Sequence, residues 1–147
     1  MLMDAGMDTG DIVLQEEAAI EPGDTYGTLH DRLALYGGEL LGRALDAASA
    51  GSLRGVPQSG EPSLTRPIEK ADLEIDPSWP PERIVNLVRA FSPSPGARLI
   101  VEGESLKVLS AHLDTGGALH IDEVIAPNRG KTDFETYVRS RRDRQSA

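Results

Sequence analysis

Apolar residues recur along the chain with two periods, and the longer period marks one extended helix. Between Thr25 and Ala50 the apolar positions are three or four residues apart, which is the spacing of one buried helical stripe. Asp24 or Thr25 can cap the start of this helix, and Gly51 can end it. The stripe consists of Leu29, Leu33, Tyr36, Leu40, Ala44 and Ala48. The pattern predicts a helix of about seven turns that needs another element to bury it.

The segments on either side of this helix carry weaker patterns. Ile12–Ile20 has a β-branched start and ends before Pro22-Gly23, which predicts one strand that needs neighbours to form a sheet. Leu53–Asp76 contains three Pro and two Gly among scattered charges. This composition predicts an extended linker between two bodies, in which only residues 63–68 have strand character.

The last part of the chain begins with a second helix. Pro80-Pro81 suits the first turn of a helix, and Ser92-Pro93 ends it. Its apolar face consists of Ile84, Leu87, Val88 and Phe91. Beyond it, alternating residues 97–109 are interrupted at 102–104, which predicts a β-hairpin. In this hairpin Leu99 and Val101 face Leu106 and Val108.

Two further elements complete this part. Residues 114–117 form a turn rich in Gly that leads into a third strand, residues 118–125. The segment from Thr132 to Glu135 has the spacing of a capping box, which predicts a short final helix that buries Phe134 and Val138. The result is a small β-rich module with two helices.

Composition excludes several classes of protein. The 147 residues suffice for one compact domain or two small ones, and the absence of Cys excludes disulfides and Cys-based zinc sites. No apolar run approaches eighteen residues and no signal peptide is recognisable, so we expect no membrane span and a cytoplasmic location. Residues 1–76 hold five Lys or Arg and fifteen Asp or Glu, whereas residues 77–147 hold ten and nine, so the acidic charge lies in the first half.

Five segments in a fixed order resemble the methionyl-tRNA formyltransferase family. They are MDAGMDTGDIVLQ, GTLHDRLALYGGELL, RPIEKADLEID, RAFSPSPGA and LHIDEVIAPNRGK. The resemblance implies an α+β fold with three parts. Residues 1–55 are the remnant strand and long helix of a Rossmann-like formyltransferase domain, residues 56–76 an interdomain linker, and residues 77–147 a small OB-like β-barrel domain with flanking helices. Family members place further strands where this chain has only residues 114–118, so the expected barrel is shortened and its edge can be open.

The resemblance also assigns chemistry to the first loop. The family transfers a formyl group from 10-formyltetrahydrofolate to the amino group of methionine on initiator tRNA, using an Asn, a His and an Asp. The match to that Asp is Asp8, and Asp4, Ala5, Gly6 and Met7 resemble the loop that lines the folate pocket. The local pattern by itself favours a structural role for Asp8, as an Asx-turn residue in a loop flanked by Gly, over a catalytic one. The family's Asn-x-His and Ser-Leu-Leu-Pro segments do not occur in this sequence, so we expect the isolated chain to lack activity.

Basic residues near the end of the chain are the candidates for contact with tRNA phosphates. They are Arg98, Lys107, Arg129 and Lys131 in the barrel, and Arg139, Arg141, Arg142 and Arg144 in the tail. Each is alternatively ordinary surface charge, and the tail is alternatively a solvated helix end. We expect no metal site, because Asp4, Asp8 and Asp11 do not fit a calcium loop. His112 and His120 are predicted to lie at the surface, and His30 is predicted to have a structural or surface role.

The sequence is compatible with three functions. The first is the C-terminal part of a methionyl-tRNA formyltransferase, from an incomplete gene or a split enzyme with a separate N-terminal half, and partly unfolded before about residue 70 when isolated. The second is a free-standing module that binds RNA or protein without catalysis. The third is part of a nucleotide-sugar N-formyltransferase, which the barrel segment disfavours.

Overall fold

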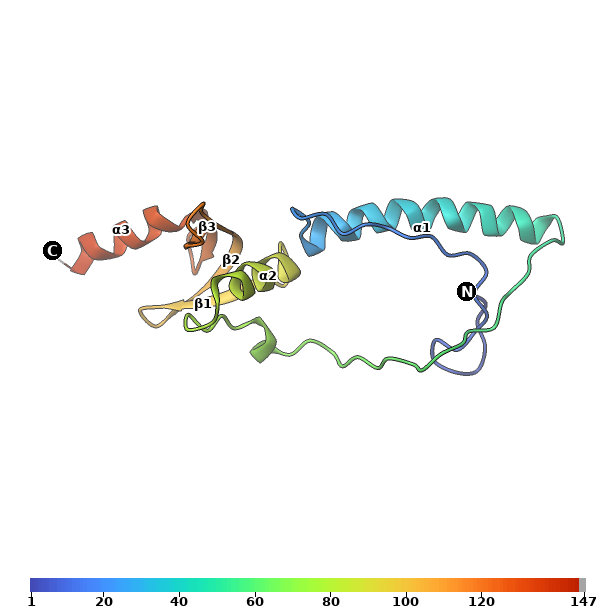
Figure 1. Cartoon of the computed structure of the whole chain (residues 1–147). Coiled ribbons are helices and arrows are strands. Elements are labelled where there is room, and N and C mark those ends of the chain that lie inside the picture. Colours follow the sequence, from blue (N-terminus) through green and yellow to red (C-terminus); the bar gives the residue numbers. More distant parts are fainter. Residues whose placement is uncertain (146–147) are drawn as a thin grey trace. The chain divides into compact units, whose positions relative to one another are not determined.

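The computed structural model describes residues 1–145 (Figure 1). Contacts divide the chain into two units: unit 1 comprises residues 1–21 and 29–67, and unit 2 comprises residues 22–28 and those from 68 onward. The helical elements are α1 (Tyr26–Ser49), the 3-10 helix η1 (Lys70–Leu73), α2 (Pro81–Phe91) and α3 (Phe134–Gln145). The strands are β1 (Ala97–Val101), β2 (Glu104–Leu113), β3 (Leu119–Ala126) and β4 (Gly130–Asp133). The α+β class predicted from the sequence is confirmed.

Helix α1 forms as predicted, and both of its ends are capped. The Thr25 hydroxyl accepts a hydrogen bond from the Thr28 backbone N–H at 3.2 Å, and the Thr28 hydroxyl accepts one from the Thr25 N–H at 2.9 Å. At the other end Gly51 has φ +66°. Its N–H bonds the Ala48 carbonyl while the Ser52 N–H bonds that of Ala47. This pair of bonds is a Schellman motif, which requires the left-handed conformation that Gly supplies.

The apolar stripe of α1 is not buried by the rest of unit 1. No residue of this helix is buried, and Leu33 and Tyr36 of the stripe are 45% and 39% exposed. The strand predicted at Ile12–Ile20 is wrong, because this segment runs extended with a single bridge, between Ile12 and Val56. An extended segment without a neighbouring strand cannot satisfy a β ladder. Side chains tie it to the helix instead, by the bond from Arg32 to the Ala19 carbonyl and the Arg43–Glu16 ion pair.

Unit 2 is built on an antiparallel sheet in the order β1-β2-β3-β4. The predicted hairpin is confirmed, with Leu99 opposite Leu106. Its two-residue turn, Glu102-Gly103, has positive φ at both positions, as a turn matched to the strand twist requires. Helix α2 also begins and ends as predicted. The buried core contains Ile75, Ile84, Val88, Ala97, Leu106, Val108, Val124, Ala126 and Tyr137.

The end of unit 2 differs from the prediction. Thr132 does not cap a helix, because it lies in β4 opposite Val124. The N-cap of α3 is Asp133, whose carboxylate accepts the Thr136 N–H at 2.9 Å. Phe134 and Val138 are only partly buried and pack at the margin of the core, whereas Tyr137 is fully buried. Tyr137 and Val138 lie three and four positions beyond Phe134, so the three residues share the helix face that is turned to the core.

The margins of the sheet determine how unit 2 is closed. Residues 70–76, within the range expected for the linker, pack with unit 2: Leu73 and Ile75 are buried, and the Ile75 N–H bonds the Arg98 carbonyl of β1 at 2.8 Å. No pairing joins β1 to β4 within the described residues, so the sheet is open there. Within residues 1–145, no helix combines the length and apolar character needed to cross a membrane.

Candidate functional site

The loop that carries the candidate catalytic residue is a tight turn organised by Asp4. The Asp4 carboxylate accepts the Gly6 N–H at 3.0 Å and the Thr9 hydroxyl at 2.6 Å. Asp4 therefore has the Asx-turn role that the sequence also allowed for Asp8. Gly10 is buried, and a Cβ at this position would collide with the Leu2 carbonyl oxygen. The backbone of this loop thus admits only Gly at residue 10.

Asp8 is held through its backbone, which leaves its carboxylate exposed. Its φ is +55°, a left-handed conformation that costs a non-Gly residue about 1 kcal/mol or more. The Gln58 side-chain amide donates to the carbonyls of Asp8 and Gly10, both at 2.8 Å. Within the described residues no side chain pairs with the Asp8 carboxylate. The loop therefore presents one carboxylate on a fixed backbone.

Gln58 is a site residue that the sequence did not reveal. It lies in the segment expected to be a linker, 48 residues beyond Gly10. Its role depends on a contact between distant parts of the chain, and no local pattern marks a glutamine for that role. The two N–H donors of its amide suit it to bind two carbonyls at once.

Only some of the predicted folate-loop residues share one hollow. A hollow of about 110 Å³ is lined by Asp4, Gly6 and Asp8, together with neighbouring residues of the first ten. Ala5 and Met7 do not line it, and Met7 is 91% exposed. Among residues 1–145 no group of three or more acidic or His side chains is arranged to hold a metal ion.

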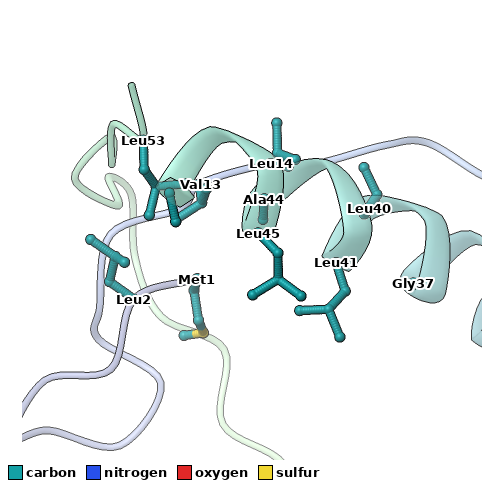
Figure 2. Close-up of a pocket in the computed structure, with 11 residues that line it drawn as sticks. Met1, Leu2, Val13, Leu14, Gly37, Leu40, Leu41, Ala44, Leu45 and Leu53 are labelled. Carbon is teal, nitrogen blue, oxygen red and sulfur yellow. The ribbon is translucent and has the colours of Figure 1, made fainter. Parts of the chain in front are cut away.

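A larger hollow lies against α1 (Figure 2). It measures about 370 Å³, and Figure 2 shows side chains of the first fourteen residues and of α1 around it. Its lining residues are Met1, Leu2, Val13, Leu14, Gly37, Leu40, Leu41, Ala44, Leu45, Ala48 and Leu53. None of these has a titratable side chain, so the hollow offers an apolar packing surface and no chemistry of its own.

In unit 2 the structure separates the candidate phosphate-binding residues into two groups. Arg98, Lys107 and Lys131 lie on the outward face of the sheet, in one row that crosses β1, β2 and β4. The other group lies in the turn before β4 and on α3, and consists of Arg129, Arg139, Arg141 and Arg142. The side chain of Arg144 lies outside the described part of the structure.

Arg141 has a structural role that the sequence did not indicate. Its guanidinium contacts Glu104 at 2.7 Å and Glu102 at 3.4 Å, and its side chain is only 23% exposed. The Tyr137 hydroxyl donates to the same Glu104 carboxylate at 2.8 Å. Burial, and then this bond to Glu104, raise the pKa of Tyr137 above its ordinary value. This network fastens α3 to the β1–β2 turn. The positive charge of Arg141 is balanced by the Glu102 and Glu104 carboxylates.

The three histidines lie at the surface, as predicted for His112 and His120. His112 and His120 face each other across β2 and β3, with stacked rings whose centroids are 5.1 Å apart. Each is paired with a carboxylate, His112 with Asp122 and His120 with Asp114. The backbone N–H groups of Ala118 and Gly116, and then His120, lower the pKa of Asp114. Nothing in this arrangement resembles a nucleophile with an adjacent base.

Comparison with known proteins points to one family. Residues 67–136 match the family described as "Formyl transferase, C-terminal domain". The methionyl-tRNA formyltransferase of Acidovorax ebreus is 47% identical over 116 residues, which cover 78% of this chain and 36% of that protein. That of Methylibium petroleiphilum is 42% identical over 131 residues, or 88% of this chain and 38% of the relative. The chain thus spans a little over a third of the length of these relatives.

A solved structure supports the fold. The methionyl-tRNA formyltransferase from Clostridium thermocellum superimposes with a TM-score of 0.65 at 20% sequence identity, covering 85% of this chain and 54% of that one.

Proposed function

The chain belongs to the methionyl-tRNA formyltransferase family and corresponds to the C-terminal part of its members, and from this premise we propose that it acts as the C-terminal portion of a formyl-transferring enzyme. Its proposed substrates are 10-formyltetrahydrofolate and methionyl initiator tRNA. The remaining catalytic groups come from sequence outside these 147 residues, on the same longer polypeptide or on a separate one.

The observation that carries this proposal is the uncovered apolar face of α1. A helix of 24 residues without a single buried side chain gains little from tertiary packing, which normally supplies most helical stability. The apolar hollow against this helix also supports a missing packing partner, because large exposed apolar patches usually mark an interface. Unit 1 is thus suited to pack against a further body, as expected for a fragment of a larger catalytic domain.

Asp8 is the residue of this chain that takes part in the proposed chemistry. Attack by the methionine amine on the formyl carbon forms the new C–N bond and gives a tetrahedral intermediate with an oxyanion and an ammonium that must lose a proton. Collapse of this intermediate breaks the bond between the formyl carbon and N10, and tetrahydrofolate leaves with a proton on N10. A carboxylate stabilises a neighbouring imidazolium. Asp8 therefore orients the His that the family supplies from its upstream segment and stabilises the protonated form of that His. The fixed backbone around Asp8 and the absence of a pairing side chain within the described residues suit this role.

Reconstitution tests the proposal. The portion of the Acidovorax ebreus relative that precedes its match to this chain is purified and mixed with the 147-residue protein, or fused to it. Transfer of formyl from 10-formyltetrahydrofolate to methionyl initiator tRNA is then measured. We expect activity only when both pieces are present, and a loss of at least about 100-fold with Asp8→Asn. Asp4→Asn, in the same loop, is the matched variant and should retain more activity.

Two results would refute the proposal. Turnover by the 147-residue protein alone would show that it needs no further segment. Equal activity of the Asp8→Asn and wild-type complexes would remove the assigned role of Asp8. Absence of activity in the mixture but not in the fusion would show that the two pieces need a covalent link, and would leave the proposed chemistry intact.

A further inference from the structure

A short segment of unit 1, residues 55–58, lies along the chain that leaves the first loop, and we call it the strap. Val56 and Ile12 are antiparallel bridge partners, and the backbone N–H of each donates to the carbonyl of the other at 2.9 Å. Gly55 lies against Asp11, because a Cβ at Gly55 would collide with the Asp11 side chain. The strap is therefore fixed in one register on this part of the chain.

This register brings Gln58 to the backbone of the loop. Because Val56 lies opposite Ile12, continuing the antiparallel register places Gln58 opposite Gly10. The Gln58 side-chain amide donates to the carbonyls of Gly10 and Asp8, each at 2.8 Å. Its nitrogen carries two N–H groups, so it can serve both carbonyls at once. The side chain thus extends the contact of the strap as far as Asp8.

The backbone of Asp8 needs such a contact. Its φ of +55° is left-handed, and a residue other than Gly keeps that conformation only where the surrounding structure imposes it. Asp4 holds Gly6 and Thr9 on either side, but makes no bond to Asp8. Within the described residues, the bond from Gln58 is the one hydrogen bond that Asp8 makes.

The same bond leaves the Asp8 side chain available. Gln58 binds the Asp8 carbonyl, so both oxygens of the carboxylate stay unused by this contact. The amide is neutral and adds no charge next to the carboxylate. Gln58 can therefore determine where the carboxylate lies without neutralising it.

We propose that Gln58 is a positioning residue for formyl transfer, which holds the Asp8 backbone so that the carboxylate meets the His of the upstream segment in the geometry that the reaction needs. This inference rests on the proposed function. Gln58 acts through Asp8 and not on a substrate. A shift of about 1 Å in a catalytic group can lower a rate about 100-fold, so a contact of this kind affects turnover. The first residues of the expected interdomain linker thus belong to the catalytic loop.

Gln58→Met tests this role, because Met keeps a long unbranched side chain and has no N–H donor. Gln58 is exposed, so the change removes no core packing. Gln15→Met is the matched control, since Gln15 is an exposed glutamine of unit 1 whose side chain makes no hydrogen bond within the described residues. Both are made in the fusion with the N-terminal portion of the Acidovorax ebreus relative. Gln58→Met should lower kcat about tenfold or more and change KM for either substrate less than about twofold. Gln15→Met should change neither by more than about twofold.

A double variant separates positioning from general damage. If Gln58 acts through Asp8, adding Gln58→Met to an Asp8→Asn enzyme should lower kcat by less than about twofold further, because the carboxylate that it positions is already lost. Independent roles would give losses that multiply. Multiplied losses in the double variant, or a wild-type kcat in Gln58→Met, would each overturn the inference.

Hydrogen exchange of the 147-residue protein tests the contact without enzyme activity. The Leu2 and Gly6 amides donate within the loop, and the Ile12 amide donates to the strap. Gln58→Met should speed exchange at these amides about two- to tenfold, as expected when a net hydrogen bond is lost, and Gln15→Met should not. Unchanged exchange in Gln58→Met, together with formyl transfer by the wild-type fusion, would refute the inference alone. A wild-type fusion without formyl transfer would refute the proposed function, and faster exchange in Gln58→Met would still support the hold of Gln58 on the loop.

Discussion

Tyr137 should be the residue that fastens α3 to the sheet of unit 2. It is the largest fully buried side chain, and its hydroxyl donates to the Glu104 carboxylate at 2.8 Å. Tyr137→Phe keeps the ring and removes one hydrogen bond to a charged acceptor, which normally contributes about 1.5–3 kcal/mol. Because Glu104 keeps its contact with Arg141, we expect a cost near the lower limit, about 1.5 kcal/mol. Tyr137→Ala also empties the site of the ring, and should cost about 3–5 kcal/mol.

Urea unfolding followed by the fluorescence of Trp79, the single tryptophan and a neighbour of this core, measures both changes. The slope of unfolding free energy against urea should be the same in wild type and Tyr137→Phe, because the buried surface is the same. Arg141→Gln should unfold at a lower urea concentration than Arg139→Gln, which removes the same charge from the same helix. A Tyr137→Phe protein as stable as wild type would refute the assigned role of the Glu104 network.

The difference in stability between wild type and Tyr137→Phe should depend on pH. Burial and the Glu104 bond raise the pKa of Tyr137 above 10.0, so the folded state favours the neutral phenol. That contribution is fully present below pH 10 and is lost as the pH rises through the higher folded pKa. The stability difference between wild type and Tyr137→Phe should therefore shrink above pH 10, whereas a constant difference up to pH 11 would contradict this cause.

Three further predictions concern the loop, the core and the sheet turn. Gly10→Ala should speed hydrogen exchange throughout residues 2–11, because a Cβ at residue 10 would collide with the Leu2 carbonyl. Gly42→Ala is the control, because a Cβ at residue 42 has no atom within 4 Å, and it should leave exchange in residues 2–11 unchanged. Equal exchange in the two variants would refute the loop geometry. Leu106→Ala should cost about 2–5 kcal/mol in urea unfolding, against less than about 0.5 kcal/mol for the exposed Ile100→Ala, and similar costs would show that the sheet faces are misassigned. Backbone donors lower the pKa of Asp114 below 3.8, so the stability that its carboxylate contributes is present above pH 3.8 and is lost as the pH falls below that value. The difference in unfolding free energy between wild type and Asp114→Asn should therefore vanish at low pH. A difference that persisted at pH 2 would contradict this cause.

The sequence predicted those elements whose signals are local. Helix α1 follows from its stripe and from the caps at Thr25 and Gly51, and the hairpin follows from alternation around Glu102-Gly103. Residues Ile12–Ile20 have strand composition but lack a partner strand, so propensity alone misassigned them. At Thr132 the sequence has a valid helix-capping pattern, but Thr132 pairs with Val124 in the sheet and does not cap a helix. Here the local pattern predicted a cap, and a contact with another strand decided the structure.

In the candidate sites, too, local patterns revealed some residues, and contacts between distant parts of the chain determined the others. The resemblance of the first loop drew attention to Asp8, but Asp4 proved to be the residue that shapes the turn. Gln58 and the Arg141 network depend on contacts between residues more than 30 apart, which no local pattern encodes. Charge composition identified the basic residues, and only strand register could show which of them lie in one row.

Hydrogen exchange of α1 tests the central claim most directly. Amides of Leu33 to Leu45 are compared with those of β2, first in the 147-residue protein alone and then with the N-terminal portion of the Acidovorax ebreus relative. If unit 1 is part of a larger catalytic domain, α1 should exchange rapidly alone, since it buries no side chain, and become protected when that portion is added. Protection of α1 equal to that of β2 in the chain alone, unchanged by the added portion, would contradict the account.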